Sequence, residues 1–442
     1  MIITVPFSEL KIWDVKSFYH QSDIFNKKYP IVLFGEFLTK PIISKVKIED
    51  TKEYKILGAR AYGKGAFVNR NVKGDTLKMR TYQQAKPNHL FWCKVDTKNG
   101  AFGIITEELA DGVASSNMTF AKIETEKANP EFLQLLFKSK RINEYMDGYV
   151  SGTTNRKYIK PDQLRDEINI VLPPIEVQNK IVNNYKIKIT LAEIQENEAR
   201  KIEEEVDEYL LNTLEVSKVE KSIKKDNFLW FNRFSDINRW DVWMNKGSIL
   251  SKKYYNTIFS DIVIGKPMYG ANVKGLKRKS NTRYIRITDI NEDGFLNDDF
   301  ASPEVVEEKY LLEENDFLIA RSGNTVGKTF LFKKKYGRAI FAGYLVKYKI
   351  DLNKVNPEYL WYFTKSYIFK KWIESNQRVS GQPNINGQEF LSAPIVLPSL
   401  DIQNQIANHL TSLKNKIKEL KDNSEKNYKS SIEDFENEIF NS

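Results

Sequence analysis

Two stretches of the chain carry the periodic apolar pattern of a long helix. Neither contains proline or glycine, from Ile175 to Lys225 and from Ser399 to Ser442. Their apolar side chains lie among dense Glu and Lys, and in the second stretch they recur at spacings of three and four, with a phase slip near Tyr428. The first stretch has Ile187, Leu191, Ile194, Ile202, Val206, Tyr209 and Leu210, and the second has Leu410, Leu413, Ile417, Leu420, Ile432, Phe435 and Ile439.

This pattern favours two coiled-coil helices over the alternative, which is a single amphipathic helix lying on the surface of its own domain. Some 40 helical residues would span roughly 60 Å, which is longer than an ordinary domain is wide. Because both helices belong to one chain, each is the obvious partner of the other.

The segments before each helix have a different pattern. Short runs rich in β-branched and aromatic residues alternate with Gly and Asn turns, at Tyr54–Leu57, Leu90–Val95, Tyr284–Ile287, Phe317–Ala320 and Tyr344–Ile350. Helices are predicted over Pro130–Tyr145 and Pro357–Glu374, because each range begins with Asn-Pro, a signal for helix entry. We expect a mixed α+β body in which strands dominate.

The chain is a tandem duplication of one unit. Asn129-Pro130-Glu131 recurs as Asn356-Pro357-Glu358, and the Leu-Pro block that opens the first long helix recurs before the second. Further blocks recur in the same order: Phe7–Val15 as Phe234–Val242, Lys138-Ser139 as Lys365-Ser366, Val150–Asn155 as Val379–Asn384, and Val171–Ile181 as Val396–Ile406. Each unit is therefore a body followed by a long helix.

The net charge of the chain says little about function, but the clustering of basic residues in two segments is informative. The chain has 68 Lys and Arg against 58 Asp and Glu, a net charge of +10, which is modest for 442 residues. Seven basic residues lie between Lys55 and Arg80 against one acid, and nine lie between Ser251 and Ile290 against two. Because the two patches occupy matching places in the repeat, nucleic-acid binding is favoured over a merely lysine-rich surface.

Several classes of chemistry are not supported by the sequence. Cys93 is the one cysteine and the three histidines lie far apart, so no disulfide framework or zinc motif is predicted. Neither a signal peptide nor an apolar run long enough to span a membrane is recognisable, so a cytoplasmic protein is expected. Residues Ser322–Thr329 look like a phosphate-binding loop, but Gly323 and Gly327 enclose one residue too few. A tight turn is predicted there instead, and no catalytic motif is found.

The pattern resembles the DNA specificity (S) subunit of type I restriction–modification systems over essentially the whole chain. The resemblance rests on the two Trp-Asp-Val segments (Trp13–Val15 and Trp240–Val242), on Gln382–Asn386, and on the two Leu-Pro blocks with Gln178 and Gln403. The first repeat departs from it, with Thr153-Thr154-Asn155-Arg156 where the second has Gln382-Pro383-Asn384-Ile385.

The resemblance implies a non-catalytic subunit that binds double-stranded DNA with a split, asymmetric recognition sequence. It implies target recognition domains at residues 1–171 and 227–396, and conserved helices at 172–226 and 397–442 that form an antiparallel spacer. The helices would dock two methyltransferase (M) subunits, and restriction (R) subunits would join the full complex. S-adenosylmethionine, ATP and magnesium would be used by those partners, and no membrane is involved.

Candidate residues follow from the patches and from the resemblance. The DNA-binding candidates are Arg60, Lys64, Arg70, Lys73, Lys78, Arg80, Lys274, Lys277, Arg278, Lys279, Arg283, Arg286, Arg321, Ser322 and Lys328. The partner-binding candidates are Pro173, Gln178, Ile181, Pro398, Gln403 and Ile406. Two alternatives stay open: a DNA-acting enzyme or half of a fused restriction–methylation protein, and a coiled-coil scaffold without a DNA role.

Overall fold

A computed structural model describes residues 24–94, 100–149, 159–216, 251–377 and 383–440. The Trp-Asp-Val segments at Trp13 and Trp240, the first-repeat block around Asn155, and Val379–Gln382 lie outside these residues. The chain forms two compact units: Met1–Glu196 with Asp422–Ser442, and Asn197–Lys421. Each unit is described by itself below. Among the described residues, no helix is both long and apolar enough to cross a membrane.

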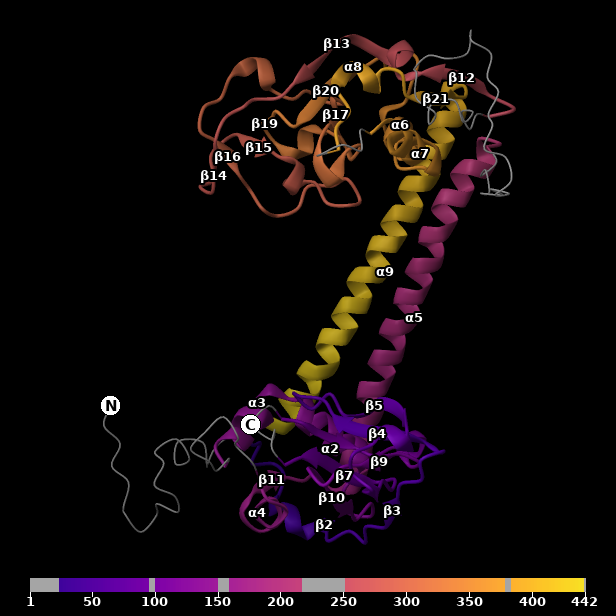
Figure 1. The fold of residues 1–442 in the computed structure, drawn as a ribbon. Helices are drawn as coiled ribbons and strands as arrows, with labels where there is room; N and C mark the ends of the chain where they lie inside the picture. The colour runs from indigo at the N-terminus through magenta and orange to yellow at the C-terminus, as the bar shows by residue number, and fades with distance from the viewer. Residues whose placement is uncertain (1–23, 95–99, 150–158, 217–250, 378–382, 441–442) are drawn as a thin grey trace. The chain divides into compact units, whose positions relative to one another are not determined.

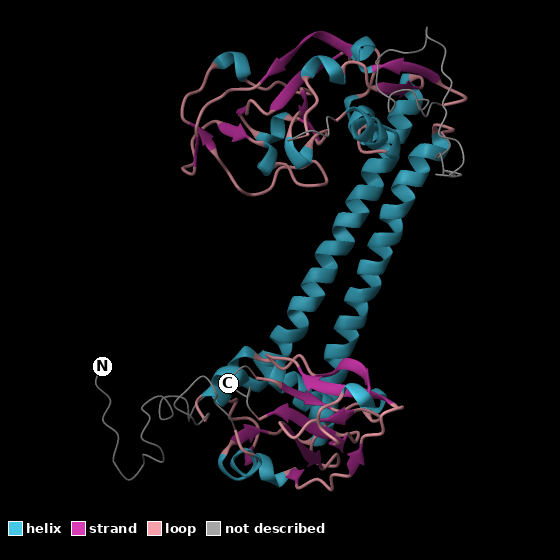
Figure 2. Cartoon of the chain, viewed as in Figure 1, coloured by secondary structure: helices cyan, strands magenta, loops and turns pink. Residues whose placement is uncertain are grey.

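Each unit contains its own four-stranded sheet, and the order of the strands is the same in both (Figures 1 and 2). In the first unit the order is β2 (Leu38–Thr39), β10 (Met118–Ile123), β7 (His89–Cys93), β8 (Phe102–Ile104). In the second it is β13 (Val263–Tyr269), β20 (Leu345–Ile350), β17 (Phe317–Ala320), β18 (Thr329–Leu331). Leu90 lies opposite Ala121 just as Phe317 lies opposite Tyr348, so the register repeats as well.

A two-stranded sheet and a set of short helices complete each scaffold. The first unit has β1 (Ile31–Leu33), β11 (Asn169–Val171), α2 (Pro130–Lys138), α3 (Lys140–Asp147) and α4 (Pro161–Glu167). The second has β12 (Tyr255–Ile258), β21 (Pro394–Leu397), α6 (Pro357–Phe363), α7 (Tyr367–Asn376) and α8 (Gly387–Phe390).

The two predicted Asn-Pro helix starts are confirmed. The side chain of Asn129 accepts hydrogen bonds from the N–H groups of Glu131 and Phe132, and Asn356 caps α6 in the same way. Each predicted helix is broken in two, because Ser139 and Ser366 adopt extended backbone angles.

The remaining strands lie in two insertions into each four-stranded sheet. One insertion follows β2 or β13 and the other follows β8 or β18. In the first unit they add β3 (Lys45–Lys47), β4 (Glu53–Ala59), β5 (Ala66–Lys73), β6 (Thr81–Gln84) and β9 (Val113–Ala114), which form a five-stranded sheet. In the second they add β14 (Gly275–Leu276), β15 (Arg283–Ile285), β16 (Ser302–Pro303) and β19 (Ala339–Phe341), which pair two by two. We call each set of inserted residues a lobe.

Two helices, α5 (Ile175–Thr213) and α9 (Leu400–Phe440), match the two predicted long helices. Within the first unit, Lys188 pairs with Asp434 and the carbonyl of Ala192 accepts from Ser424 Oγ. Within the second unit, Glu198 pairs with Lys416 and the ring of Tyr209 lies 4.2 Å from that of His409. In both units the partner's number falls as the α5 number rises, so the helices run antiparallel, as predicted.

The predicted apolar seam is only half right. In the second unit Ala199, Ile202 and Ile417 form a buried cluster between the helices. In the first unit Ile187, Leu191 and Ile194 are 56%, 43% and 55% exposed, and the polar contacts with α9 come instead from Lys188, Ala192 and Gln195. Polar contacts replace them there, because Ser424, Asn427 and Asp434 of α9 bond to α5.

Each unit completes its core with the end of the other repeat's long helix. Phe435, Ile439 and Phe440 of α9 are buried in the core of the first unit, among Phe132 and Tyr145. In the second unit Leu210 and Leu211 of α5, and Leu214 just after it, are buried in the same way. The folding units therefore do not coincide with the repeats read from the sequence.

Candidate nucleic-acid interface

The first basic patch forms a hairpin at the edge of the five-stranded sheet. Strands β4 and β5 pair antiparallel, and a bulge opposite Ile56 and Leu57 accommodates Asn69. Strand β5 is the edge strand, and the side chains of Arg70 and Lys73 are exposed on it. Cations exposed on an edge strand are suited to neutralising DNA phosphates.

The tip of this hairpin is held in place by the scaffold. Gly63 adopts a positive φ of 59°, its N–H donates to Gly100 O at 2.8 Å, and its carbonyl accepts from Gln134 Nε2 at 2.6 Å. A Cβ atom at Gly63 would lie 1.9 Å from the carbonyl oxygen of Phe137, so only glycine fits. Arg60 and Lys64 are exposed on either side of this anchor.

Lys78 and Arg80 differ in what they can offer to DNA. Lys78 is exposed. Arg80 already pairs with Asp50 and donates to the carbonyl oxygens of Gly74 and Ile48, at 3.2 and 3.3 Å. Its guanidinium stabilises the loop around η3 (Gly74–Thr76), so Arg80 does not fit the role of a free DNA contact.

The second basic patch divides in the same way. Lys274, Lys277, Arg278 and Lys279 are exposed around β14, and none forms an ion pair with a described residue. Arg286 is bound through Nε and Nη2 to both carboxylate oxygens of Asp289, which is fully buried. Arg283 donates to the carbonyls of Asn297 and Asp299. These two arginines stabilise the fold of the lobe through these bonds, and their selection as DNA contacts stays a prediction.

Residues Ser322–Thr329 form the turn between β17 and β18. The two strands pair antiparallel and a short 3-10 helix, η10 (Gly323–Thr325), joins them, so the turn predicted in place of a phosphate-binding loop is confirmed. Lys328 is mostly buried, pairs with Glu292 at 2.8 Å and is thereby occupied. Ser322 is 9% exposed and bridges to Asn384.

Arg321, in contrast, forms no ion pair with the described residues, and its Nε has no hydrogen-bond partner among them. It is half-buried beside the same turn, and its guanidinium carbon lies 5.0 Å from the centre of the Tyr269 ring. Within the described part of the chain, Arg321 Nε and Asn384 Oδ1 are buried without a hydrogen-bond partner. Neither Tyr269 nor Asn384 was selected from the sequence, although Asn384 lies in the Gln-Pro-Asn segment.

Comparison with known proteins identifies this part of the fold. Residues 261–427 match the family model described as the type I restriction modification DNA specificity domain. Most of the second unit is similar to a type I DNA specificity domain. The resemblance suggested by the sequence is therefore confirmed, and this family is non-catalytic.

Solved structures support the same fold over nearly the whole chain. The HsdS subunit from Thermoanaerobacter tengcongensis is 12% identical with a TM-score of 0.51, and the match covers 94% of this chain and 97% of that one. A chain from a structure on complex assembly and conformational transition of the type I R-M system is 14% identical with a TM-score of 0.52, covering 93% and 96%. None of the curated proteins matches the sequence.

Within this specificity fold, the two glutamines selected as partner contacts have an internal role. Gln178 is fully buried; its Oε1 accepts from the N–H of Asn129 at 2.8 Å and its Nε2 donates to the carbonyls of Lys127 and Pro173. Gln403 is also fully buried, and it bonds in the same way to the N–H of Asn356 and to the carbonyls of Lys354 and Pro398. Each glutamine fixes the start of a long helix to the body of its own unit.

The other partner candidates are mostly inaccessible as well. Pro173, Pro398 and Ile406 are buried inside their units. Direct contact with a partner therefore does not fit these residues or the two glutamines. Ile181 is the exception, because it is half-exposed on α5.

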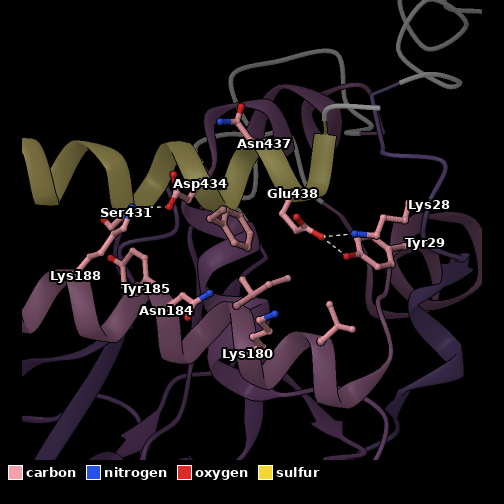
Figure 3. A pocket seen from close by; sticks show the side chains of 13 residues that line it. Lys28, Tyr29, Lys180, Asn184, Tyr185, Lys188, Ser431, Asp434, Asn437 and Glu438 are labelled. Carbon is pink, nitrogen blue, oxygen red and sulfur yellow. Dashed lines mark hydrogen bonds and ion pairs between the residues drawn. The ribbon is translucent and has the colours of Figure 1, made fainter.

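Ile181 lines a hollow of about 550 Å³ between the start of α5 and the end of α9 in the first unit (Figure 3). Val177 and Phe435 form its apolar lining with Ile181. At the rim Glu438 accepts hydrogen bonds from Tyr29 and Lys28, which hold the pKa of this carboxyl below its usual value.

The described residues also show no group of three or more His, Cys, Asp or Glu side chains that could hold a metal ion.

Proposed function

We propose that this chain is the specificity subunit of a type I restriction–modification complex. It binds double-stranded DNA with a split, asymmetric target, and each unit reads one half. Residues 1–171 and 227–396 act as the target recognition domains, and residues 172–226 and 397–442 act as the spacer helices.

One observation carries this proposal: two scaffolds with the same strand order bear two dissimilar lobes, and each lobe exposes a cluster of basic side chains. The sheet order, its register and the glutamine contacts repeat between the units. The lobes enter these sheets at matching points, yet one is a five-stranded sheet and the other consists of paired short strands. Equal frames with unequal inserts, each exposing Lys and Arg side chains to a phosphate backbone, are what reading two different half-sites requires.

The long helices suit the role of a spacer. At 39 and 41 residues each is about 60 Å long. An added heptad in both helices would lengthen the spacer by about 10 Å, which corresponds to about three base pairs of DNA. We expect such a variant to recognise the same half-sites with a wider gap. An unchanged gap in a folded, active variant would contradict the spacer role.

Partner subunits supply the chemistry in this proposal. Two methyltransferase subunits use S-adenosylmethionine, and restriction subunits use ATP and magnesium. The docking surface that fits a methyltransferase helix is the exposed apolar stripe of Ile187, Leu191 and Ile194 on α5. Their spacing of four and three places them on one helix face, and an exposed apolar face is typical of a protein interface.

The function is tested by methylome sequencing of a host that carries the chain with its methyltransferase. We expect one bipartite motif. Replacing residues 227–393 with those of a relative should change one half of that motif and preserve the other. If both halves changed, the division of labour would be wrong. If the purified complex bound DNA with a flat salt response, the DNA role itself would fail.

The docking stripe is tested by the triple variant I187S/L191S/I194S. Co-purification of the methyltransferase subunit should be lost, because three apolar contacts are removed from one face. E193A, an exposed polar position on the same helix, is the matched control and should leave the complex intact. Normal assembly of the triple variant would reject the stripe without affecting the DNA-binding proposal.

A further inference from the structure

An arginine that identifies a base must be free and rigid. It must be free because a guanidinium already bound to a carboxylate of its own chain cannot also pair with a guanine edge. It must be rigid because ordering a long side chain on binding costs affinity and weakens discrimination. The structure allows each arginine among the DNA-binding candidates to be judged on both points.

The first requirement removes most candidates. Arg286 is held by buried Asp289, and Arg80 is held by Asp50 and two carbonyls. Arg283 lies over the ring of Phe300, but its Nη2 donates to two carbonyls. Arg70 and Arg278 are exposed and form no ion pair with a described residue. They meet the first requirement only, because no aromatic ring orients their guanidinium.

Arg60 meets both requirements in the first unit. It is exposed, and its guanidinium carbon lies 4.5 Å from the centre of the Phe67 ring. Its backbone N–H donates to Gly65 O at 3.0 Å, which closes the hairpin loop that Gly63 anchors to the scaffold. The ring and the closed loop together orient the guanidinium before any DNA is bound.

Arg321 meets both requirements in the second unit. Its guanidinium lies over Tyr269, and its backbone is fixed on both sides by hydrogen bonds with Tyr344 and Ile385. The unpaired Nε of Arg321 and the unpaired Oδ1 of Asn384 add a second observation. Buried polar atoms without partners are costly. Here an unpaired donor and an unpaired acceptor lie on two segments that are paired through their backbones, and a base edge with complementary groups would satisfy both.

We propose that Arg60 and Arg321 are the residues that read guanine in the two half-sites, one residue in each. This inference rests on the proposed function. Each arginine donates two parallel hydrogen bonds to O6 and N7 of a guanine in the major groove. The exposed lysines and unstacked arginines contact phosphates and supply affinity that is independent of sequence. The target therefore contains a guanine in each half at the position that the arginine reaches.

The test is a binding selection with the full chain in complex with its methyltransferase subunits, on DNA randomised within each half-site. In R60K and R321K the positive charge is kept and the planar fork is lost. We expect the preference for guanine at one position to fall by roughly 5- to 150-fold, in one half-site only, with an unchanged salt slope. R70A and R278A are the matched controls. They should weaken binding to all sequences alike and reduce the salt slope by about one.

The outcomes separate this inference from the proposed function. Suppose that the wild-type complex selects a sequence and that R60K and R321K select the same one. The role of Arg60 and Arg321 in reading guanine is then wrong, and the specificity function stands. If the wild-type complex selects no sequence, the proposed function itself fails. Thermal unfolding of each variant identifies misfolding. A second test is F67L, which removes the aromatic ring beside Arg60 and keeps the arginine. It should reduce the same guanine preference in the first half-site only, and an unchanged preference would overturn the assignment.

Discussion

The core of the first unit includes residues from the C-terminal end of α9. Replacing one of them, Phe435, tests how much this end contributes to the stability of the unit. Phe435 is 3% exposed and its ring meets that of Phe132 edge-on at 6.0 Å. Replacing a buried phenylalanine with alanine costs about 3–5 kcal/mol, through lost burial and an unfilled cavity. For a unit of this size the melting temperature should fall by roughly 10 °C. F435A should therefore destabilise the first unit and spare the second.

Hydrogen exchange measured by mass spectrometry can locate this loss. In F435A we expect faster exchange in peptides of the first unit, such as those of α2 and β7, and native protection in α6 and β17. L211A is the matched control, because Leu211 is 3% exposed in the core of the second unit and should give the reverse pattern. Y428A, on the exposed surface of α9, should change neither. Equal loss of protection in both units of F435A would refute the reasoning.

Three further changes have definite expected outcomes. Q403A removes the partner of three backbone groups, of which the carbonyl of Pro398 is buried. Urea denaturation should therefore show a loss of about 2–4 kcal/mol, and an unchanged midpoint would contradict the internal role. R286A leaves the buried carboxylate of Asp289 without its partner and should cost about 3–5 kcal/mol, whereas R278A on the surface should cost little. Burial, reinforced by the nearby ammonium of Lys414, lowers the pKa of Lys365 to about 6. Between that value and the ordinary pKa near 10.5, the unfolded chain binds the extra proton, so stability should rise with pH by about 1.4 kcal/mol per unit, and K365M should lose this slope.

Much of the architecture follows from patterns that are local in the sequence. Asn129 and Asn356 mark helix starts because an amide side chain before a proline can cap the first turn, wherever the helix lies. The two long helices follow from the absence of proline and glycine over many residues. The duplication revealed that both bodies share one fold, which the repeated sheet order confirms.

The errors concern contacts between residues far apart in the sequence. A periodic apolar row shows that a helix has an apolar face, but it does not show what covers that face. Ile187, Leu191 and Ile194 therefore looked like a seam, although α9 packs on another side of α5. In the same way, the sequence counts Arg286 and Arg321 as equal charges. Only the fold shows that one faces Asp289 and the other faces Tyr269.

Each lobe begins and ends on the four-stranded sheet of its own unit. A change in the length of a lobe therefore costs little folding free energy, which favours the evolution of new specificities. Residues 40–88 and 270–316 begin and end on strands that the scaffold holds in a fixed register. The entropy of closing such an excursion grows only with the logarithm of its length, so doubling it costs about 0.6 kcal/mol. A lobe can therefore be lengthened, shortened or exchanged by recombination while the frame stays folded. Natural variation should thus be concentrated in these two stretches, and the glutamine contacts that hold the frame should stay constant.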